Sequence, residues 1–282
     1  MIEFNDITRT YARKVAVDGL TLEIPSGQLF ALLGPNGAGK TTTIKMLTGL
    51  LRPTRGTVRV CGHDLVTEVR HATSSIGYVP EEPFLYDKLS GREFLEFVAE
   101  MRGLDRSVIE KRIQRECQYF DLHDFIDDLT ETYSHGMKQR LVFASAMLHD
   151  PPVLVIDEPM IGLDPRSVRI AKDRMCKQAA AGTTIFMSTH TLAIAEEIAD
   201  RIGIMNHGRL HFLGTVDELQ RELASHHRSL ELLFLELTDG SNGYSKRAAG
   251  EKYGEEKSGR RASISALPPQ PSDPAREQTT PQ

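Results

Sequence analysis

A glycine-rich segment, Gly34-Pro-Asn-Gly-Ala-Gly-Lys-Thr41, has the residue types and the spacing needed to hold a phosphate group. Its glycines let successive backbone N–H groups turn inward around an anion, at a helix N-terminus that already favours negative charge. Lys40 supplies a point charge for the β- and γ-phosphates of a nucleotide, and the Thr41 hydroxyl can ligate Mg²⁺. The segment matches G-x-x-x-x-G-K-[ST] and stands between an apolar run (29–33) and a helical pattern, as that motif requires. The sequence therefore predicts a nucleotide phosphate site.

Two carboxylates follow a second apolar run and supply the acidic groups that such a site needs. The run Val153-Leu-Val-Ile156 has the composition of a buried strand, and Asp157 and Glu158 come directly after it. Asp157 suits the Mg²⁺-associated position, and Glu158 is placed to polarise an attacking water as a general base. Alone, this pattern would indicate only a solvated strand end. Together with the phosphate loop it predicts hydrolysis of a nucleoside triphosphate.

A third motif, Tyr133-Ser-His-Gly-Met-Lys-Gln-Arg-Leu141, lies between the other two. Here the chain resembles the ATP-binding subunit of ABC transporters, whose signature usually reads LSGGQ followed by Gln-Arg. Ser134 and Gly136 match the signature, whereas the residues on either side of Gly136 and the first residue of the motif depart from it. The alternative reading of Ser134 is that it simply caps the helix that follows.

Further positions carry the resemblance in the expected order, and it covers about residues 1–220. Tyr11 resembles the aromatic residue on which adenine stacks. Asp164, in Ile161-Gly-Leu-Asp-Pro, resembles the D-loop aspartate, although Ile161 replaces the usual small polar residue. His190, after an apolar strand pattern, resembles the switch histidine that contacts the γ-phosphate.

Glu81 stands where the family usually has a glutamine that contacts Mg²⁺ and the attacking water. A carboxylate is a good Mg²⁺ ligand, but while ionised it cannot donate a hydrogen bond. It also repels the γ-phosphate by about 4 kcal/mol at ~4 Å and intermediate dielectric, a cost that coordination to Mg²⁺ would largely offset. We therefore expect Glu81 to be a tolerated substitute. The alternative is a solvated loop residue that points away.

The expected cofactors are ATP and Mg²⁺, and the expected site combines the motifs above. The residues expected to bind ATP are Tyr11, Gly34, Pro35, Asn36, Gly37, Ala38, Gly39, Lys40, Thr41, Thr42, Ser134, Gly136 and Asp164. Those expected to act in catalysis are Glu158, His190 and Glu81, and those expected to ligate the metal are Thr41, Asp157 and Glu81. In this family two domains face each other head to tail. The resemblance therefore implies a second ATPase subunit, most simply in a homodimer.

The order of strand and helix patterns predicts an α/β fold. The expected architecture is a P-loop NTPase core with an N-terminal antiparallel β subdomain and an inserted α-helical subdomain at about 82–150. Strands are expected near the N-terminus, at 74–79 and at 184–187, besides the apolar runs above. The ATPase domain is expected at 1–220, a short C-terminal helical element at 221–238 and a disordered tail at 239–282. That tail has few residues able to form a core.

Composition limits the partners and the location. Hydrophobic residues make up 40% of the 282, and the net charge of -5 gives no electrostatic reason to expect nucleic acid. Three dispersed cysteines favour a reducing cytoplasm, and no apolar run reaches the ~20 residues of a membrane helix. With the resemblance, this implies a peripheral subunit on the inner face of the cell membrane, bound to a separate transmembrane permease. Export is favoured over import. The alternative is a soluble ABC ATPase that acts on ribosomes or DNA.

Overall fold

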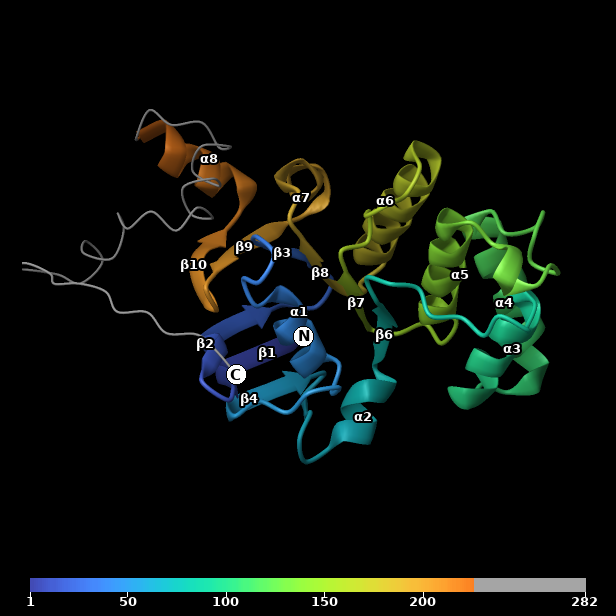
Figure 1. Ribbon diagram of the computed structural model, residues 1–282, viewed down its shortest axis with the longest axis horizontal. Helices are drawn as coiled ribbons and strands as arrows, with labels where there is room; N and C mark the ends of the chain where they lie inside the picture. The colour runs from blue at the N-terminus through green and yellow to red at the C-terminus, as the bar shows by residue number, and fades with distance from the viewer. Residues whose placement is uncertain (226–282) are drawn as a thin grey trace, which may run out of the picture. The chain divides into compact units, whose positions relative to one another are not determined.

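Two β-sheets of different type form the centre of the computed structural model, which describes residues 1–225 (Figure 1). The first is antiparallel, with the strand order β2-β1-β4-β5. Its strands are β1 Ile2–Tyr11, β2 Lys14–Ile24, β4 Arg55–Val60 and β5 His63–Asp64. This sheet confirms the predicted N-terminal antiparallel subdomain, with longer strands than the sequence pattern indicated.

The second sheet has the order β10-β9-β3-β8-β7-β6, and only its edge strand β10 runs antiparallel. Its strands are β3 Leu29–Leu33, β6 Ile76–Val79, β7 Val153–Asp157, β8 Thr184–Thr189, β9 Arg201–Asn206 and β10 Arg209–Gly214. Because parallel strands end at the same edge of a sheet, the segments after β3, β6, β7 and β8 are brought together there. These segments carry the phosphate loop, Glu81, Glu158 and His190.

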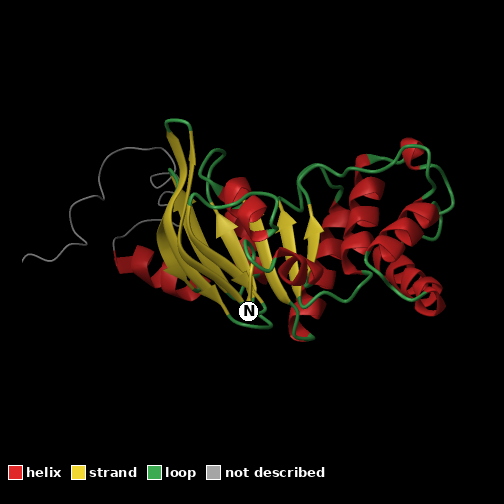
Figure 2. Ribbon diagram, turned by 90° about the horizontal axis from the view of Figure 1, so that it is seen from below, coloured by secondary structure: helices red, strands yellow, loops and turns green. Residues whose placement is uncertain are grey.

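Helices lie beside the strands, and several of them gather at one side of the sheets (Figure 2). They are α1 Lys40–Leu47, α2 Val69–Ser74, α3 Gly91–Met101, α4 Arg106–Phe120, α5 His135–Met147, α6 Pro165–Ala180, α7 Leu192–Ile198 and α8 Val216–Ser225, with a 3₁₀ turn at Thr130–Thr132. Helices α3 to α5 lie in the region predicted as the helical insertion. Within residues 1–225 no helix is both long enough and apolar enough to cross a membrane.

Two hydrophobic clusters lie on opposite faces of the parallel sheet. Along β3, Leu29, Ala31 and Leu33 pack in the cluster that includes the helices α3 to α6. Phe30 and Leu32 point the other way and pack with the antiparallel sheet and α1. This alternation follows from the two-residue repeat of a strand, and it explains why β3 is apolar throughout. The end of β3 is thus fixed from both sides.

Two predicted boundaries differ from the structure. Ser74 was expected to begin a strand, but it ends α2, and the strand begins at Ile76. The Ser74 hydroxyl donates a hydrogen bond back to the His71 carbonyl, which satisfies the last turn of the helix. The boundary expected at 220/221 falls within α8. Residues 226–238 of the expected helical element and the whole expected tail lie outside the described residues.

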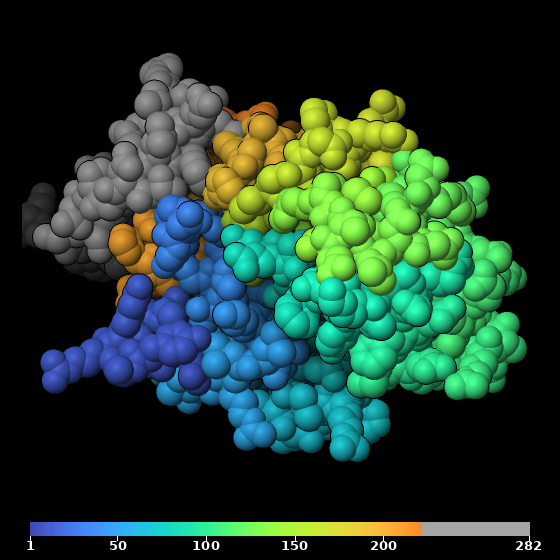
Figure 3. Space-filling view, turned by 45° about the vertical axis from the view of Figure 1, so that its right-hand side comes forward, coloured from blue at the N-terminus to red at the C-terminus, as the bar shows by residue number. Residues whose placement is uncertain are grey.

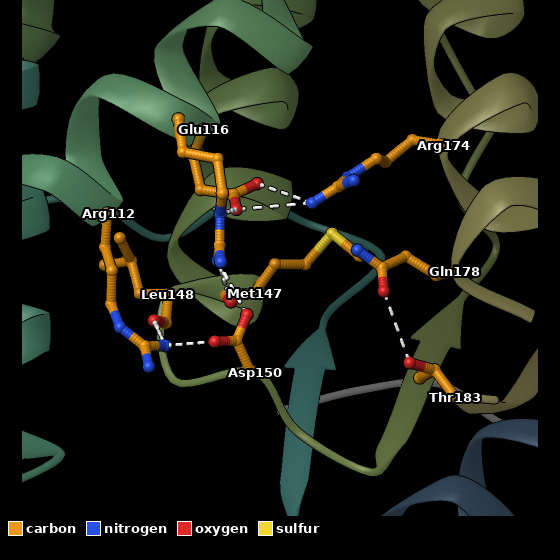
Figure 4. A network of polar contacts seen from close by, with 9 residues as sticks. Arg112, Glu116, Met147, Leu148, Asp150, Arg174, Gln178 and Thr183 are labelled. Atoms are coloured by element: carbon orange, nitrogen blue, oxygen red, sulfur yellow. Dashed lines mark hydrogen bonds and ion pairs between the residues drawn. The ribbon is translucent and has the colours of Figure 1, made fainter. Parts of the chain in front are cut away.

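A buried ion-pair network joins α4 to α6 (Figure 4). The Glu116 carboxylate is fully buried; it lies 3.3 Å from Arg174 of α6 and 2.7 Å from Nε of the neighbouring Arg115. Arg115 also pairs with Asp150, in the loop between α5 and β7, at 2.7 Å. Burial raises the pKa of Glu116, and the two guanidinium groups oppose that rise. The helical segment is therefore held to the core by charges as well as by apolar contacts.

Candidate functional site

Two glycines of the phosphate loop are required by the close approach of other backbone segments. A Cβ atom at Gly34 would lie 2.2 Å from the Met205 carbonyl oxygen, and one at Gly39 would lie 2.5 Å from that of Ala16. Gly39 also has φ 114°, a conformation that side chains disfavour, and it stands directly before α1. The loop is thus wedged between β9 and β2, with its backbone at the N-terminus of a helix.

Lys40 lies at the bottom of the loop. Its amine donates hydrogen bonds to the carbonyl oxygens of Gly34, at 2.8 Å, and Pro35, at 3.3 Å. It also lies 3.2 Å from Oε1 of Glu158, and both side chains are only 6% exposed. A desolvated cation held in this way offers a strong, fixed interaction to a phosphate group.

Asp157 ends β7 and is almost completely buried. The Ser188 hydroxyl, from the paired position of β8, donates a 2.6 Å hydrogen bond to its Oδ1 atom. Burial raises the pKa of Asp157 and the Glu158 charge raises it further, while hydrogen bonds to Ser188 and Thr41 and the Lys40 charge lower it. The Asp157 carboxylate and the Thr41 hydroxyl therefore lie side by side. Both are oxygen ligands of the kind that Mg²⁺ prefers.

Glu158 occupies the centre of the site. Its backbone has φ 48°, and its N–H donates a 3.0 Å hydrogen bond to the Ser188 hydroxyl. Its Oε1 atom faces Lys40, and Oε2 lies 2.9 Å from Nδ1 of His190. The His190 side chain is about half exposed, at 48%. A carboxylate fixed between a buried lysine and a histidine can accept a proton from a water molecule above it.

A cavity of about 240 Å³ opens over the phosphate loop. Its lining includes most of the expected site; the residues are Tyr11, Lys14, Ala16, Pro35, Asn36, Gly37, Gly39, Lys40, Thr41, Thr42, Glu81 and Glu158. Glu81 is among these lining residues. Gly34 and Ala38 support the loop without lining the cavity.

Sequence reasoning missed Lys14 and Ala16. They belong to the start of β2, where Lys14 pairs with Tyr11 of β1 across the hairpin. The sequence did offer a signal for Lys14. This lysine comes three residues after Tyr11, the expected adenine-stacking residue, so a tight turn brings the two together. Lys14 adds a second positive charge to the lining.

The signature residues form a separate cluster with the D-loop. Ser134 caps α5 by accepting a hydrogen bond from the Met137 N–H at 3.3 Å, and Asp164 caps α6. A Cβ atom at Gly136 would lie 3.1 Å from Oδ2 of Asp164, so the two motifs touch. The Ser167 hydroxyl, which donates a hydrogen bond to Asp164, holds the pKa of that carboxyl below its usual range. Ser134, Gly136 and Asp164 are not among the described residues that line the phosphate cavity.

Two residues that depart from the usual motifs contact each other. The His135 ring nitrogen Nε2 lies 3.2 Å from the Ile161 carbonyl oxygen, which links the signature to the D-loop. Ile161 also lines a second cavity of about 130 Å³, together with Glu158, His190 and Met160. Glu158 thus lies between the phosphate cavity on one side and the D-loop region on the other.

The site combines a glycine loop that carries Lys40, two carboxylates at the end of β7, and His190 against the second carboxylate, Glu158. This geometry defines a P-loop nucleoside triphosphatase site. A model of the family described as ABC transporter matches residues 17–161. The chain belongs to this family, as one of its ATP-binding proteins. The predicted family, the fold class and the function as an ABC transporter ATP-binding subunit are therefore confirmed.

Three relatives illustrate the similarity. YhaQ of Bacillus subtilis (strain 168), an uncharacterized ABC transporter ATP-binding protein, is 34% identical over 89% of this chain and 85% of its own length. The daunorubicin/doxorubicin resistance ATP-binding protein DrrA of Streptomyces peucetius is 39% identical over 82% and 70%. The bacitracin transport ATP-binding protein BcrA of Enterococcus faecalis is 36% identical over 85% and 75%.

Among solved structures, one described as the ATP binding subunit of an ABC transporter superposes with a TM-score of 0.78. It is 35% identical and covers 84% of this chain and 99% of its own. The similarity therefore extends over the antiparallel sheet, the parallel sheet and the helical segment together.

Proposed function

We propose that this chain hydrolyses ATP in an Mg²⁺-dependent reaction and couples this reaction to the export of a solute through a separate membrane-spanning permease. The observation that carries the proposal is the Glu158 carboxylate, held between Lys40 and His190 on the wall of the phosphate cavity. Lys40 and the loop amides bind the β- and γ-phosphates, and Tyr11 stacks on the adenine. Glu158 accepts the proton of the attacking water, and His190 orients Glu158 and contacts the γ-phosphate.

Mg²⁺ supplies charge neutralisation for the phosphates when it is bound. Thr41, Asp157 and Glu81 are the oxygen donors that fit it, since Asp157 is buried against the Thr41 side chain and Glu81 lines the same cavity. Burial raises the pKa of Asp157, and the charge of a bound divalent ion would oppose that rise.

Two chains are needed for a complete site in this proposal. The cluster of Ser134, Gly136 and Asp164 is separate from the cavity lining of its own chain, and its polar groups are exposed at the N-termini of α5 and α6. A helix N-terminus that faces an ATP molecule on another chain would bind its γ-phosphate. A head-to-tail homodimer supplies this arrangement, and hydrolysis is then tied to closure of the dimer.

An exposed apolar patch is the proposed contact with the permease. Phe84, Tyr86, Phe97 and Met101 are 74%, 48%, 41% and 72% exposed, and Tyr86 packs edge to face against both phenylalanines. The patch follows Glu81 in the chain, in the turquoise part of Figure 3 that adjoins the green helical segment. Exposed clusters of large apolar side chains mark interaction surfaces. The membrane contact of this subunit would be made through the permease, on the cytoplasmic face.

The direction of transport follows from the relatives. DrrA is named for resistance to daunorubicin and doxorubicin, and BcrA for bacitracin transport. Removal of a toxic solute from the cell is the transport that confers resistance, so we place this chain in an exporter.

Two measurements test the proposal. Purified chain should hydrolyse ATP with Mg²⁺ and not with EDTA, and Glu158→Gln should lose turnover while still binding ATP. An affinity-tagged chain should co-purify from membranes with a membrane-spanning protein, and Phe84→Asp should weaken that association without changing ATP binding. Co-purification with ribosomes or nucleic acid in place of a membrane protein would contradict the transport function and support a soluble ABC ATPase.

A further inference from the structure

Two histidines and a glutamate that do not line the phosphate cavity converge elsewhere on the surface. One ligand atom each from His63, Glu68 and His71 can be chosen so that all three lie within 4.8 Å of one another. The Nδ1 atom of His63 lies 3.1 Å from Oε1 of Glu68, and the rings of the two histidines stack at 5.3 Å between centroids. The cluster therefore already gathers two nitrogen donors and one carboxylate oxygen.

The three side chains come from adjacent elements. His63 lies on the short edge strand β5, Glu68 stands directly before α2, and His71 lies within α2. Helix α2 is labelled in Figure 1. The connecting turn is held by Asp64, whose Oδ1 atom accepts hydrogen bonds from the N–H groups of Val66 and Thr67 at 2.8 and 3.0 Å. The backbone of the turn is thus held by its own hydrogen bonds.

Glu68 is held in place from both sides. Its Oε2 atom accepts a hydrogen bond from the Asp64 N–H at 3.4 Å, while Oε1 faces His63. Oε1 of Glu68 and Nδ1 of His63 therefore already face each other at short distance, and both are atom types that ligate Zn²⁺.

We propose that His63, Glu68 and His71 form a binding site for a divalent transition-metal ion of the zinc class, with water in the fourth position. Two imidazole nitrogens and a carboxylate are a donor set that Zn²⁺ accepts, whereas Mg²⁺ and Ca²⁺ prefer oxygen alone. Ligand atoms at ~2.0–2.1 Å from a tetrahedral ion lie roughly 3.3 Å from each other. The two ligand atoms that are now farthest apart must therefore approach each other by at most about 1.5 Å. The His63 and Glu68 side chains are 40% and 48% exposed, which leaves them free to make that adjustment.

A bound ion would tie β5 to α2. This part of the chain leads directly into β6, whose end carries Glu81, and α2 has only six residues. An isolated helix of that length gains little stability from its own hydrogen bonds. Since an ion that binds only the folded state stabilises it by mass action, zinc should raise the melting temperature of the chain.

The test measures zinc binding to the tag-free full chain by calorimetry. The buffer contains excess Mg²⁺ to occupy oxygen sites, and Cys176→Ser removes an exposed thiol. The proposal predicts one zinc ion per chain and a rise in Tm of roughly 2–4 °C at saturation. Co²⁺ bound in place of zinc should give the visible absorption of a tetrahedral ion.

Matched variants locate the site. His71→Ala and Glu68→Gln should each weaken zinc binding by at least about tenfold, the size expected when a ligand or its close support is lost. Both changes are at exposed positions, so the fold should be kept, as circular dichroism would show. His123→Ala, also at an exposed histidine, should leave binding unchanged. Absence of zinc binding in the parent chain, or binding that survives both His63→Ala and His71→Ala, would overturn the proposal.

Discussion

Single residues of the phosphate loop show how little freedom the site allows. Lys40 is buried against two backbone carbonyls and Glu158. A Cβ atom added at Gly39 would lie only 2.5 Å from the Ala16 carbonyl oxygen. Both constraints come from segments distant in the chain. The motif spacing predicts that a phosphate loop exists, but only the packing against β2 shows which of its glycines resist substitution.

Gly39→Ala should therefore abolish ATP binding and lower stability by about 2 kcal/mol or more, from the positive φ and the clash with a backbone atom. Gly182→Ala is the matched control, because Gly182 has φ +101° but nothing within 4 Å of an added Cβ. It should cost only about 1–2 kcal/mol and keep ATP binding. Nucleotide titration and denaturant unfolding measure both variants. Equal losses of ATP binding would contradict this explanation.

Glu81 faces the cavity as an acid where the family has an amide. We expect Glu81→Gln to change ATPase turnover by less than about tenfold, which corresponds to roughly 1.4 kcal/mol in the barrier. The reason is that either side chain offers an oxygen to Mg²⁺. Steady-state ATPase rates compare it with Glu158→Gln. Loss of activity as complete as in Glu158→Gln would show that the carboxylate itself is essential.

Elements were predictable where their patterns were regular. The apolar runs of β3 and β7 were visible in the sequence, and β3 has the expected bounds. The strand β9 was not predicted, because Gly203 interrupts it, and a Cβ there would lie 2.9 Å from the Phe30 ring. The full length of β1 was missed because its pairing with β2 shifts register three times, which breaks the alternation.

The junction of α4 and α6 gives a prediction at this scale. Glu116→Ala should destabilise the chain by about 3–5 kcal/mol, because it leaves the buried Arg174 guanidinium without its partner. Glu131→Ala removes an ion pair with the exposed Lys88, which solvent screens, and should leave the free energy of unfolding almost unchanged. Urea unfolding measures both. A small effect of Glu116→Ala would show that the ion pair adds nothing to the apolar contacts of this junction.

The stability of the whole chain should depend on pH through the partly buried His149. Burial lowers the pKa of His149 to about 4, and its Nε2 atom lies 3.3 Å from the Ile76 carbonyl oxygen. The unfolded chain takes up a proton on this ring near pH 6.5, whereas the folded chain does so only near pH 4. The stability due to the neutral ring is thus complete above about pH 6.5 and is lost as the pH falls towards 4.

His149→Gln should reduce that pH dependence. Since the His149 ring is partly exposed, we expect its pH-dependent contribution to the free energy of unfolding to be about 1–2 kcal/mol. Thermal unfolding of both chains between pH 4 and 7 measures it, and the difference in Tm between them should narrow or reverse at low pH. A constant difference in Tm across this range would contradict the assignment of the effect to His149.

At the scale of the whole molecule, the sequence predicted the family and its motifs, yet it could not show how they are grouped. Ser134 and Asp164 cap the helices α5 and α6, and neither is among the described residues that line the phosphate cavity. In the proposed dimer a second chain completes the site.

The molecular mass of Glu158→Gln in solution, measured by sedimentation with and without Mg²⁺ and ATP, tests this most directly. ATP that cannot be hydrolysed should hold two chains together, so we predict a monomer without ATP and a dimer with it. A chain that binds ATP but remains a monomer at every concentration would contradict the two-chain site.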